Sequence, residues 1–432
     1  MTLFNPEHAR IAVIGLGYVG LPLAVGFARH FPVVGFDLDP QRIDELQGGH
    51  DRTGETPSDA LEASNALFTA ESGEIDGCNV FIITVPTPVD GNDLPDLSAL
   101  EAACRIVGPA LAKGDLVVVE STVYPGVTET VCGPALSAAS ELLCGEDFFL
   151  GYSPERINPG DRQHTVEKIV KVVAGQSAAV TAFLVEFYGK VARGQVFAAS
   201  DIRTAEAAKV IENAQRDINI AFINEVSMIF DSLGLDTEDV LATARTKWNF
   251  IDFRPGLVGG HCIGVDPFYL AHAARESGHE PEIVLAGRRI NDRMASYVAE
   301  RIAQLLGPPD GAGGTGRVLV LGLTFKENVP DLRNTKVVDL IKALAAKGFE
   351  VAVHDAIADE DQARRDYGIE LLKELAQAKD YDCIIGAVAH DEYQRFGRED
   401  VVGLLKPGGL VADVKGIWKR LDLPGEIRRW QL

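Results

Sequence analysis

The feature that most constrains the fold is a glycine-rich turn near the start of the chain, between an apolar strand and a helix. Residues 11–15 read Ile-Ala-Val-Ile-Gly, which is typical of a short buried strand, and residues 19–30 suit a helix. The turn, Gly15-Leu16-Gly17-Tyr18-Val19-Gly20, matches G-x-G-x-x-G. A second strand, Val33 to Phe36, ends at Asp37. This order predicts a Rossmann-like unit that binds a dinucleotide.

Each part of this turn has a physical role in dinucleotide binding. The first glycine permits the tight bend, and the second lets the backbone approach a pyrophosphate that lies on the helix N-terminus. Asp37 is expected to bond the ribose hydroxyls and repel a 2′-phosphate, which favours NAD over NADP. Arg42 could stack on adenine, bind the ribose or lie in solvent. A purely structural turn is the alternative. The predicted NAD contacts come from Gly15, Gly17, Tyr18, Val19, Gly20, Asp37 and Arg42.

Beyond the turn, buried β-branched strands alternate with helical segments, a pattern typical of a parallel sheet. The expected later strands of this first part are 80–85, 116–120, 148–152 and 169–173. From about 202 to 305 the pattern is helical, with one long helix first and a loop at 248–266. Residues 307–316 are rich in Gly and Pro and read as a linker.

A second strand–helix alternation follows the linker, with strands expected at 317–322, 350–354, 382–387 and 410–414. We therefore predict an α/β fold of two Rossmann-like doubly wound domains, joined by a central helical domain with one long helix. The expected limits are 1–200, 201–306 and 307–432. The segment 321–326, Leu-Gly-Leu-Thr-Phe-Lys, lacks the glycine fingerprint. The last domain is thus expected to bind something other than a dinucleotide.

Composition excludes several classes of function. The chain has 432 residues and a formal net charge of −22, which argues against a nucleic-acid binder. Its six cysteines form no C-x-x-C pair, so neither a metal site nor a disulfide scaffold is expected, and a reducing cytoplasm fits. The uncharged stretch 11–28 is interrupted by glycines and a proline. We interpret it as strand and turn, not as a membrane span.

A reactive thiol is the second strong signal. Residues 259–262 read Gly-Gly-His-Cys, and Asp266 follows four residues after Cys262. A thiol nucleophile in a chain that also binds a hydride acceptor indicates an oxidation through an enzyme-bound thioester. A buried structural cysteine is the alternative.

These motifs together resemble the UDP-glucose/GDP-mannose dehydrogenase family. Besides the two signals above, the matches are Val85-Pro86-Thr87-Pro88, Glu120-Ser121-Thr122-Val123, Ser153-Pro154-Glu155-Arg156, Lys209 with Asn213, and Phe325-Lys326 with Asp331-x-Arg333. The resemblance implies an NAD domain, a helical middle through which the chain forms a homodimer, and a C-terminal domain for the nucleotide sugar.

Within the family, the segments 153–160 and 247–250 resemble the branch that oxidises UDP-N-acetylhexosamines. UDP-glucose members usually carry a second Glu where this chain has Pro159. The implied reaction takes the C6 hydroxyl of UDP-GlcNAc or UDP-GalNAc to the carboxylate, for polysaccharide precursor synthesis. A UDP-glucose or GDP-mannose 6-dehydrogenase is one alternative. A nucleotide-sugar-binding regulator without turnover is another.

The resemblance also implies roles for particular residues. Cys262 would hold the thiohemiacetal and thioester, and Asp266 would act as a base or orient water, although it could instead cap a helix. Lys209 and Asn213 would stabilise an oxyanion; otherwise they are a solvated lysine and a surface amide. Glu155 would be the base for hydrolysis, and Thr122 would orient the water. Thr122 and Thr87 would also contact the cofactor. Glu155 and Thr122 could instead be helix-cap or turn residues.

Cations would hold the substrate pyrophosphate. The expected substrate contacts are Glu155, Arg156, Lys209, Asn213, Arg254, Gly259, Lys326 and Arg333. Surface charge pairing is the alternative for Arg254, Lys326 and Arg333. Arg254 could also act in the partner subunit. No base chemistry is assigned to His261.

Overall fold

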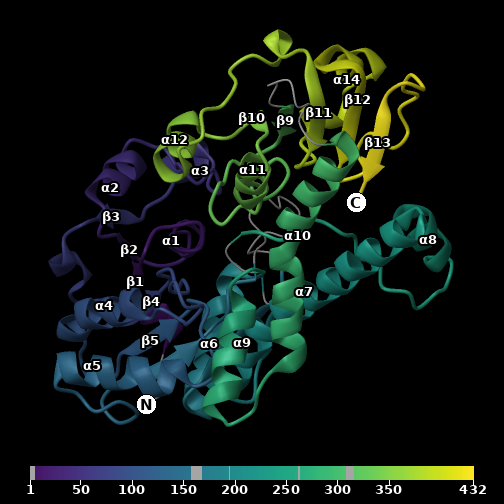
Figure 1. Ribbon diagram of the computed structural model, residues 1–432. Helices are drawn as coiled ribbons and strands as arrows, with labels where there is room; N and C mark the ends of the chain where they lie inside the picture. Colours follow the sequence, from purple (N-terminus) through teal and green to yellow (C-terminus); the bar gives the residue numbers. More distant parts are fainter. Residues whose placement is uncertain (1–4, 157–167, 194, 261–262, 308–315) are drawn as a thin grey trace. The chain divides into compact units, whose positions relative to one another are not determined.

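The computed structural model describes residues 5–156, 168–193, 195–260, 263–307 and 316–432 (Figure 1). Internal contacts divide the chain into two units. Unit 1 comprises residues 1–212 with 268–280, and unit 2 comprises residues 213–267 with 281–432. Each unit contains one sheet.

The sheet of unit 1 has the strand order β3-β2-β1-β4-β5-β6-β7-β8. Its neighbours pair in parallel except for β6 and β7, which are antiparallel. The strands are β1 Ile11–Ile14, β2 Val33–Phe36, β3 Leu67–Thr69, β4 Val80–Ile83, β5 Leu116–Val119, β6 Phe149–Tyr152, β7 Lys171–Gly175 and β8 Val196–Ala198. Because β1 lies inside the sheet and pairs with both β2 and β4, the turn that follows it lies where the strand order reverses.

Helices cover both faces of this sheet. Ile11 and Val13 of β1 belong to a core with residues of α1 and α6, while Ala12 and Ile14 belong to a second core with residues of α4 and α5. Alternate side chains of a strand point to opposite faces, so the two cores lie on either side of the sheet. The helices are α1 Gly20–Ala28, α2 Pro40–Gln47, α3 Ser58–Glu62, α4 Ser98–Val107, α5 Gly133–Ser140, α6 Ala178–Val191 and the start of α7 Ile202–Leu233.

Unit 2 has a five-stranded parallel sheet in the order β10-β9-β11-β12-β13. The strands are β9 Arg317–Leu321, β10 Glu350–His354, β11 Tyr381–Gly386, β12 Leu405–Asp413 and β13 Arg428–Gln431. Its helices are the rest of α7, α8 Thr237–Ala244, α10 Glu282–Leu306, α11 Val337–Ala346, α12 Glu360–Tyr367, α13 Asp391–Gln394 and α14 Arg398–Leu404. Helix α9, Asp266–Glu276, begins in unit 2 and continues in unit 1.

A buried polar cluster joins α7 and α10 within unit 2. Arg288 Nη1 lies 2.5 Å from Asp217 Oδ1, and Asn291 Nδ2 donates to the same oxygen at 2.8 Å. Asn224 Nδ2 donates to Asn291 Oδ1 at 2.8 Å and to the carbonyl of Gly256 at 3.0 Å. These bonds fix the loop after α8 against the long helix, because an unpaired buried amide would cost about 1–3 kcal/mol.

The predicted fold class is confirmed: two doubly wound sheets and a helical region with one long helix are present. The pattern did not predict β3, β8 and β13, which have three or four residues and lie at sheet edges. Edge strands are half covered and carry mixed burial, so their apolar signal is weak. No helix among the described residues has both the length and the apolar character needed to cross a membrane.

Candidate functional site

The glycine turn of unit 1 has the geometry that a pyrophosphate requires. Gly15 has φ +93°, a conformation that favours glycine. A Cβ on Gly20 would lie 1.9 Å from the carbonyl oxygen of Gly15, so the helix and turn pack too closely for any side chain. A Cβ on Gly17 would meet nothing within 4 Å. The backbone at Gly17 is therefore open to a ligand. The N-cap residue of α1 is Val19, and its side chain makes no hydrogen bond to the first amides of the helix.

Asp37 ties the second strand to the turn. Its Oδ2 accepts from the Leu16 amide at 2.7 Å and its Oδ1 from the Asp39 amide at 3.0 Å. Arg42 is buried, with Nε donating to the Leu16 carbonyl at 2.9 Å and Nη2 to Asp51 at 2.7 Å. Because Arg42 is buried, its side chain does not lie in solvent, which was one of the three positions considered for it. The turn, the open Gly17 and the carboxylate at the strand end fit a dinucleotide.

Two threonines at the ends of adjacent strands come together. Thr87 follows β4 and Thr122 follows β5, and Thr87 Oγ1 donates to the Thr122 carbonyl at 2.7 Å. Tyr269 on α9 donates its hydroxyl to the Thr87 carbonyl at 2.6 Å. The carboxyl ends of parallel strands are where ligand sites gather in α/β sheets.

Glu155 lies in a buried cluster of charges. Lys171 Nζ lies 2.5 Å from Glu120 Oε2 and 3.5 Å from Glu155 Oε2. The Arg156 amide donates to Glu155 Oε1 at 2.6 Å. The Arg156 side chain is directed elsewhere: its Nη2 pairs with Glu212 at 2.8 Å and its Nη1 donates to the Val170 carbonyl at 3.1 Å. Glu155 is thus held by a backbone donor on one oxygen and an ammonium on the other.

Lys209 and Asn213 both lie on α7, one turn apart, and both are buried. Neither is the solvated side chain of the alternative interpretation. Asn213 Nδ2 donates to Asp266 Oδ2 at 2.5 Å, in unit 2. Asp266 opens α9 and is almost fully buried, so the amide holds its carboxylate at the start of that helix.

Cys262 and His261 lie outside the described residues, but the two glycines before them are described. A Cβ on Gly259 would lie 2.6 Å from the Asn334 carbonyl oxygen, and one on Gly260, which has φ +90°, would lie 2.7 Å from the Phe325 ring. The Gly260 amide donates to the Asn334 carbonyl at 3.3 Å. The glycine pair therefore lets this loop lie directly against the segment 325–335.

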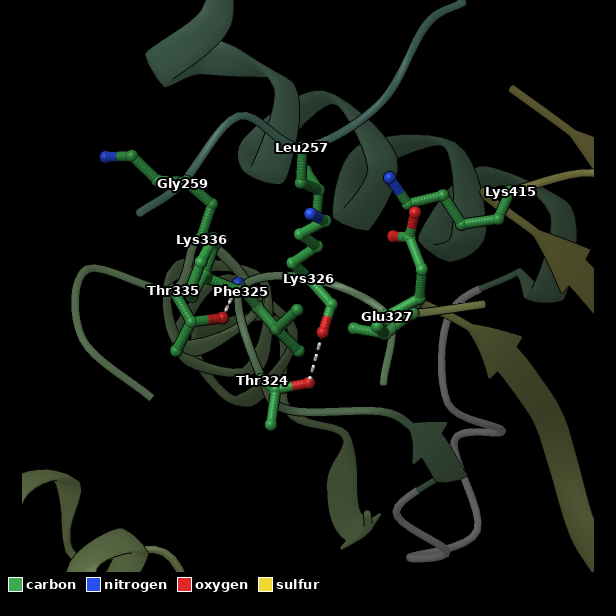
Figure 2. Close-up of a pocket in the computed structure, with 12 residues that line it drawn as sticks. Leu257, Gly259, Thr324, Phe325, Lys326, Glu327, Thr335, Lys336 and Lys415 are labelled. Carbon is green, nitrogen blue, oxygen red and sulfur yellow. Dashed lines mark hydrogen bonds between the residues drawn. The ribbon is translucent and has the colours of Figure 1, made fainter. Parts of the chain in front are cut away.

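A small pocket in unit 2 adjoins Gly259 and contains Lys326, one of the predicted substrate residues (Figure 2). Thr324, which also lines it, donates its hydroxyl to the Lys326 carbonyl at 2.9 Å. Lys336 and Lys415 line the same pocket, and Figure 2 shows the Lys415 ammonium directed toward the Glu327 carboxylate. Burial lowers the pKa of Lys415, and Glu327 opposes that shift. Lys326 and Lys415 are cations of the kind that suit a pyrophosphate, whereas Figure 2 shows the Lys336 ammonium directed away from them.

Sequence reasoning did not single out Lys336 or Lys415. Lys415 comes two residues after β12, and that position alone could have indicated it, since side chains at the carboxyl ends of parallel strands often contact ligands. Lys336 precedes α11 and had no such signal; its ammonium lies 3.1 Å from both Asp292 and Asp339.

The structure does not place Arg254 and Arg333 in this pocket. Arg333 pairs with Asp331, two residues before it, at 2.7 Å. Arg254 pairs with Glu238 at 3.1 Å and lines a larger, open cavity of about 790 Å³ with Lys415, Lys419 and Arg420. Both ion pairs match the surface-pairing alternative, and substrate contacts from these two arginines stay predictions.

A dinucleotide-dependent dehydrogenase is the class that this fold and its glycine turn define. Three models of one family match the chain in succession: its NAD binding domain at residues 9–192, its central domain at 203–293 and its UDP binding domain at 319–420. The chain belongs to the UDP-glucose/GDP-mannose dehydrogenase family. The predicted family, the NAD cofactor and the assignment as an NAD-dependent oxidoreductase are confirmed.

Several relatives match over nearly the whole chain. The chain is 50% identical to a UDP-N-acetyl-D-glucosamine 6-dehydrogenase of Pseudomonas aeruginosa, over 95% of this chain and 97% of the relative. It is 47% identical to the protein of that name from Salmonella typhi (96% and 97% covered), and 49% identical to Protein CapL of Staphylococcus aureus (98% and 100% covered). The solved structure of a UDP-D-ManNAc dehydrogenase from Pyrococcus horikoshii superimposes with a TM-score of 0.86 at 29% identity, covering 97% of this chain and 98% of that one.

Proposed function

We propose that the chain oxidises the C6 hydroxyl of a UDP-N-acetylhexosamine, UDP-GlcNAc or UDP-GalNAc, to the uronic acid. The observation that carries this proposal is the 47–50% identity to two UDP-N-acetyl-D-glucosamine 6-dehydrogenases over nearly the whole chain. Pro159, where UDP-glucose members usually have Glu, agrees with an acetamido sugar. The product would serve polysaccharide synthesis, as the similarity to Protein CapL suggests.

The cofactor accepts one hydride in each of two oxidation steps when it is bound. We propose that Gly15, Gly17, Gly20 and the amides of Tyr18 and Val19 hold its pyrophosphate. Asp37 would bond the ribose hydroxyls, with Arg42 bracing the turn through Leu16 and Asp51. Turnover with NAD⁺ should greatly exceed turnover with NADP⁺, and a preference for NADP⁺ would remove Asp37 from this role.

The substrate would pass through two covalent states on Cys262. After the first oxidation, the thiolate adds to the C6 aldehyde to form a thiohemiacetal. Lys209 and Asn213 would stabilise its oxyanion, for which their burial is favourable, since hydrogen bonds to charge are stronger away from water. The second oxidation gives a thioester, and water then releases the carboxylate and the thiol.

Hydrolysis needs a base that removes a proton from water. We propose Glu155 for this role, because the Arg156 amide and Lys171 hold its two oxygens in place. Thr122 would orient the water, and Asp266 would act as a base or orient water near Cys262. Lys326 and Lys415 are the proposed cations for the UDP pyrophosphate. The contributions of Arg254 and Arg333, a homodimer through the central helices, the domain limits at 200 and 306, and a cytoplasmic location stay predictions.

A panel of nucleotide sugars with NAD⁺ tests the proposal. UDP-GlcNAc or UDP-GalNAc should yield two NADH for each uronic acid formed. Faster turnover of UDP-glucose or GDP-mannose would contradict the acetamido-sugar assignment, and tight UDP-sugar binding without NADH would favour the regulator. Cys262→Ser should abolish acid formation; a variant that retains it would refute the thioester route.

A further inference from the structure

The buried charge cluster around Lys171 arises from the way three neighbouring strands meet. Glu120 directly follows β5 and Glu155 follows β6, which runs parallel to β5. Strand β7 is antiparallel to β6 and begins with Lys171, so its first residue lies at the edge where β5 and β6 end. The sheet topology thus brings one ammonium between two carboxylates that are far apart in the chain.

The three charged side chains of this cluster differ in their exposure to solvent. The side chains of Lys171 and Glu120 are 1% and 0% exposed, whereas that of Glu155 is 9% exposed. Glu120 is closed off further by Tyr188 on α6, whose hydroxyl donates to Glu120 Oε1. Lys171 therefore faces two carboxylates of different kinds: Glu120, sealed in the core, and Glu155, which is the one more open to solvent.

Such a cluster is a poor way to stabilise a fold. A buried ion pair repays its desolvation only with good geometry, and replacing it with apolar side chains is often neutral or stabilising. Here one buried ammonium serves two carboxyl groups. Burial raises the pKa of Glu120 despite Lys171, while Glu120 and Glu155 together raise the pKa of Lys171 against the effect of its burial.

We propose that Lys171 and Glu120 are positioning residues that set the orientation of Glu155 and the charge beside it; this inference rests on the proposed role of Glu155 in thioester hydrolysis. Lys171 holds Oε2 of Glu155, while the Arg156 amide holds Oε1. Glu120 binds the ammonium at 2.5 Å and so weakens its hold on Glu155. Glu155 is therefore fixed at both oxygens, beside a cation that it shares with Glu120.

Among the described residues near Glu155, two other ionisable side chains have partners of their own. Tyr188 on α6 donates to Glu120. The Arg156 guanidinium pairs with Glu212 on α7. Lys209, also on α7, is assigned to the oxyanion and is not changed in any variant below. Among the described residues, Lys171 is the cation that pairs with both carboxylates.

Two substitutions should move the pH dependence of hydrolysis in opposite directions. Lys171→Met removes the cation beside Glu155 and leaves Glu120 nearby, so the acid limb should shift upward by about one to three pH units. Glu120→Gln releases Lys171 to act on Glu155 alone, so the acid limb should shift downward. The double variant, which removes both charges together, should lie between the two single variants. A merely structural role would give loss of activity without opposite shifts.

The experiment uses the whole chain with NAD⁺ and UDP-GlcNAc. Intact mass spectrometry follows the covalent adduct on Cys262, and the rate of its hydrolysis is measured from pH 5 to 9. Lys171→Met should accumulate the adduct at pH 7 and keep the initial NADH burst. Lys190→Met, an exposed lysine on α6, is the matched control and should behave as wild type. If Lys171→Met fails to fold, Tyr188→Phe is the substitute: it removes only the donor to Glu120, which then binds Lys171 more strongly, so the acid limb should shift upward by less than in Lys171→Met.

The outcomes separate this inference from the proposed function. If the wild type forms neither NADH nor adduct with any UDP-sugar, the proposed function fails. If the wild type hydrolyses its adduct normally but Lys171→Met and Glu120→Gln shift the acid limb in the same direction, or leave it unchanged, the positioning role is wrong.

Discussion

Replacing Gly20 with alanine should destabilise unit 1 strongly, and the same change at Gly17 should not. A Cβ on Gly20 would lie 1.9 Å from the Gly15 carbonyl oxygen and 2.4 Å from Thr84 Oγ1. Real Cβ atoms essentially never approach below 3.0 Å, so the turn or the helix must move by about 1.1 Å. Thr84 cannot yield easily, because its hydroxyl donates to the carbonyls of Ile14 at 3.0 Å and Gly15 at 2.7 Å.

Overpacking in a well-packed core typically costs about 1–3 kcal/mol, and this contact lies at the upper end because both neighbours are fixed. We expect Gly20→Ala to lower the free energy of unfolding by about 3 kcal/mol or more. Gly17→Ala meets nothing within 4 Å and should change it by less than about 0.5 kcal/mol. Its methyl group would instead occupy the space where the pyrophosphate approaches, and NAD⁺ should bind about 10- to 100-fold more weakly.

Urea unfolding of the apo protein by far-UV circular dichroism measures the stability, and calorimetric titration with NAD⁺ measures the affinity. The two variants should separate the two quantities, with Gly20→Ala losing stability and Gly17→Ala losing only affinity. Wild-type stability in Gly20→Ala would show that the turn tolerates a side chain. Wild-type affinity in Gly17→Ala would show that the pyrophosphate does not lie on this backbone.

Three further predictions concern single groups. Asn213→Ala removes the donor to Asp266 and should cost about 1–3 kcal/mol in urea unfolding; an unchanged midpoint would contradict it. Burial raises the pKa of Glu206 to about 6 from 4.5, so its stabilising contribution is present below pH 4.5 and is lost as pH rises through 6. Between pH 4.5 and 7, the unfolding free energy of Glu206→Gln should therefore fall by about 2 kcal/mol less than that of the wild type. Because the pKa of Lys415 is lowered, UDP binding measured calorimetrically should weaken from pH 7 to 9.5, and Lys415→Arg should flatten this decline; parallel declines would refute it.

Much of the fold was predictable because its signals are local. The strands β1, β2, β4 and β5 are short continuous apolar runs, and the structure places each within a residue or two of its predicted limits. Edge strands such as β3 and β8 escaped prediction because only part of each is covered. The buried polar cluster of α7 and α10 also escaped, since Asp217 and Arg288 carry the charges expected of a solvated helix face.

The candidate site divides in the same way. The glycine turn and Asp37 lie within one strand–turn–helix–strand segment, and the Gly-Gly pair before Cys262 marks a close backbone approach. Lys171 is different, because it opens an otherwise apolar strand and a lone lysine there carries no functional signal. Arg254 and Arg333 show the reverse case: their charge suggested substrate contacts, and the structure shows them paired with Glu238 and Asp331.

The sequence by itself determined the class of fold, the dinucleotide turn and the family, because each depends on residues adjacent in the chain or on ordered motifs. Only the tertiary structure decided which charges meet. Lys171 reaches Glu120 across 51 residues and Glu155 across 16, through the antiparallel pairing of β7 that no local pattern indicates. Hydrophobic periodicity records which face of an element is buried, but not which buried faces pack together, and the environment of Glu155 depends on the latter.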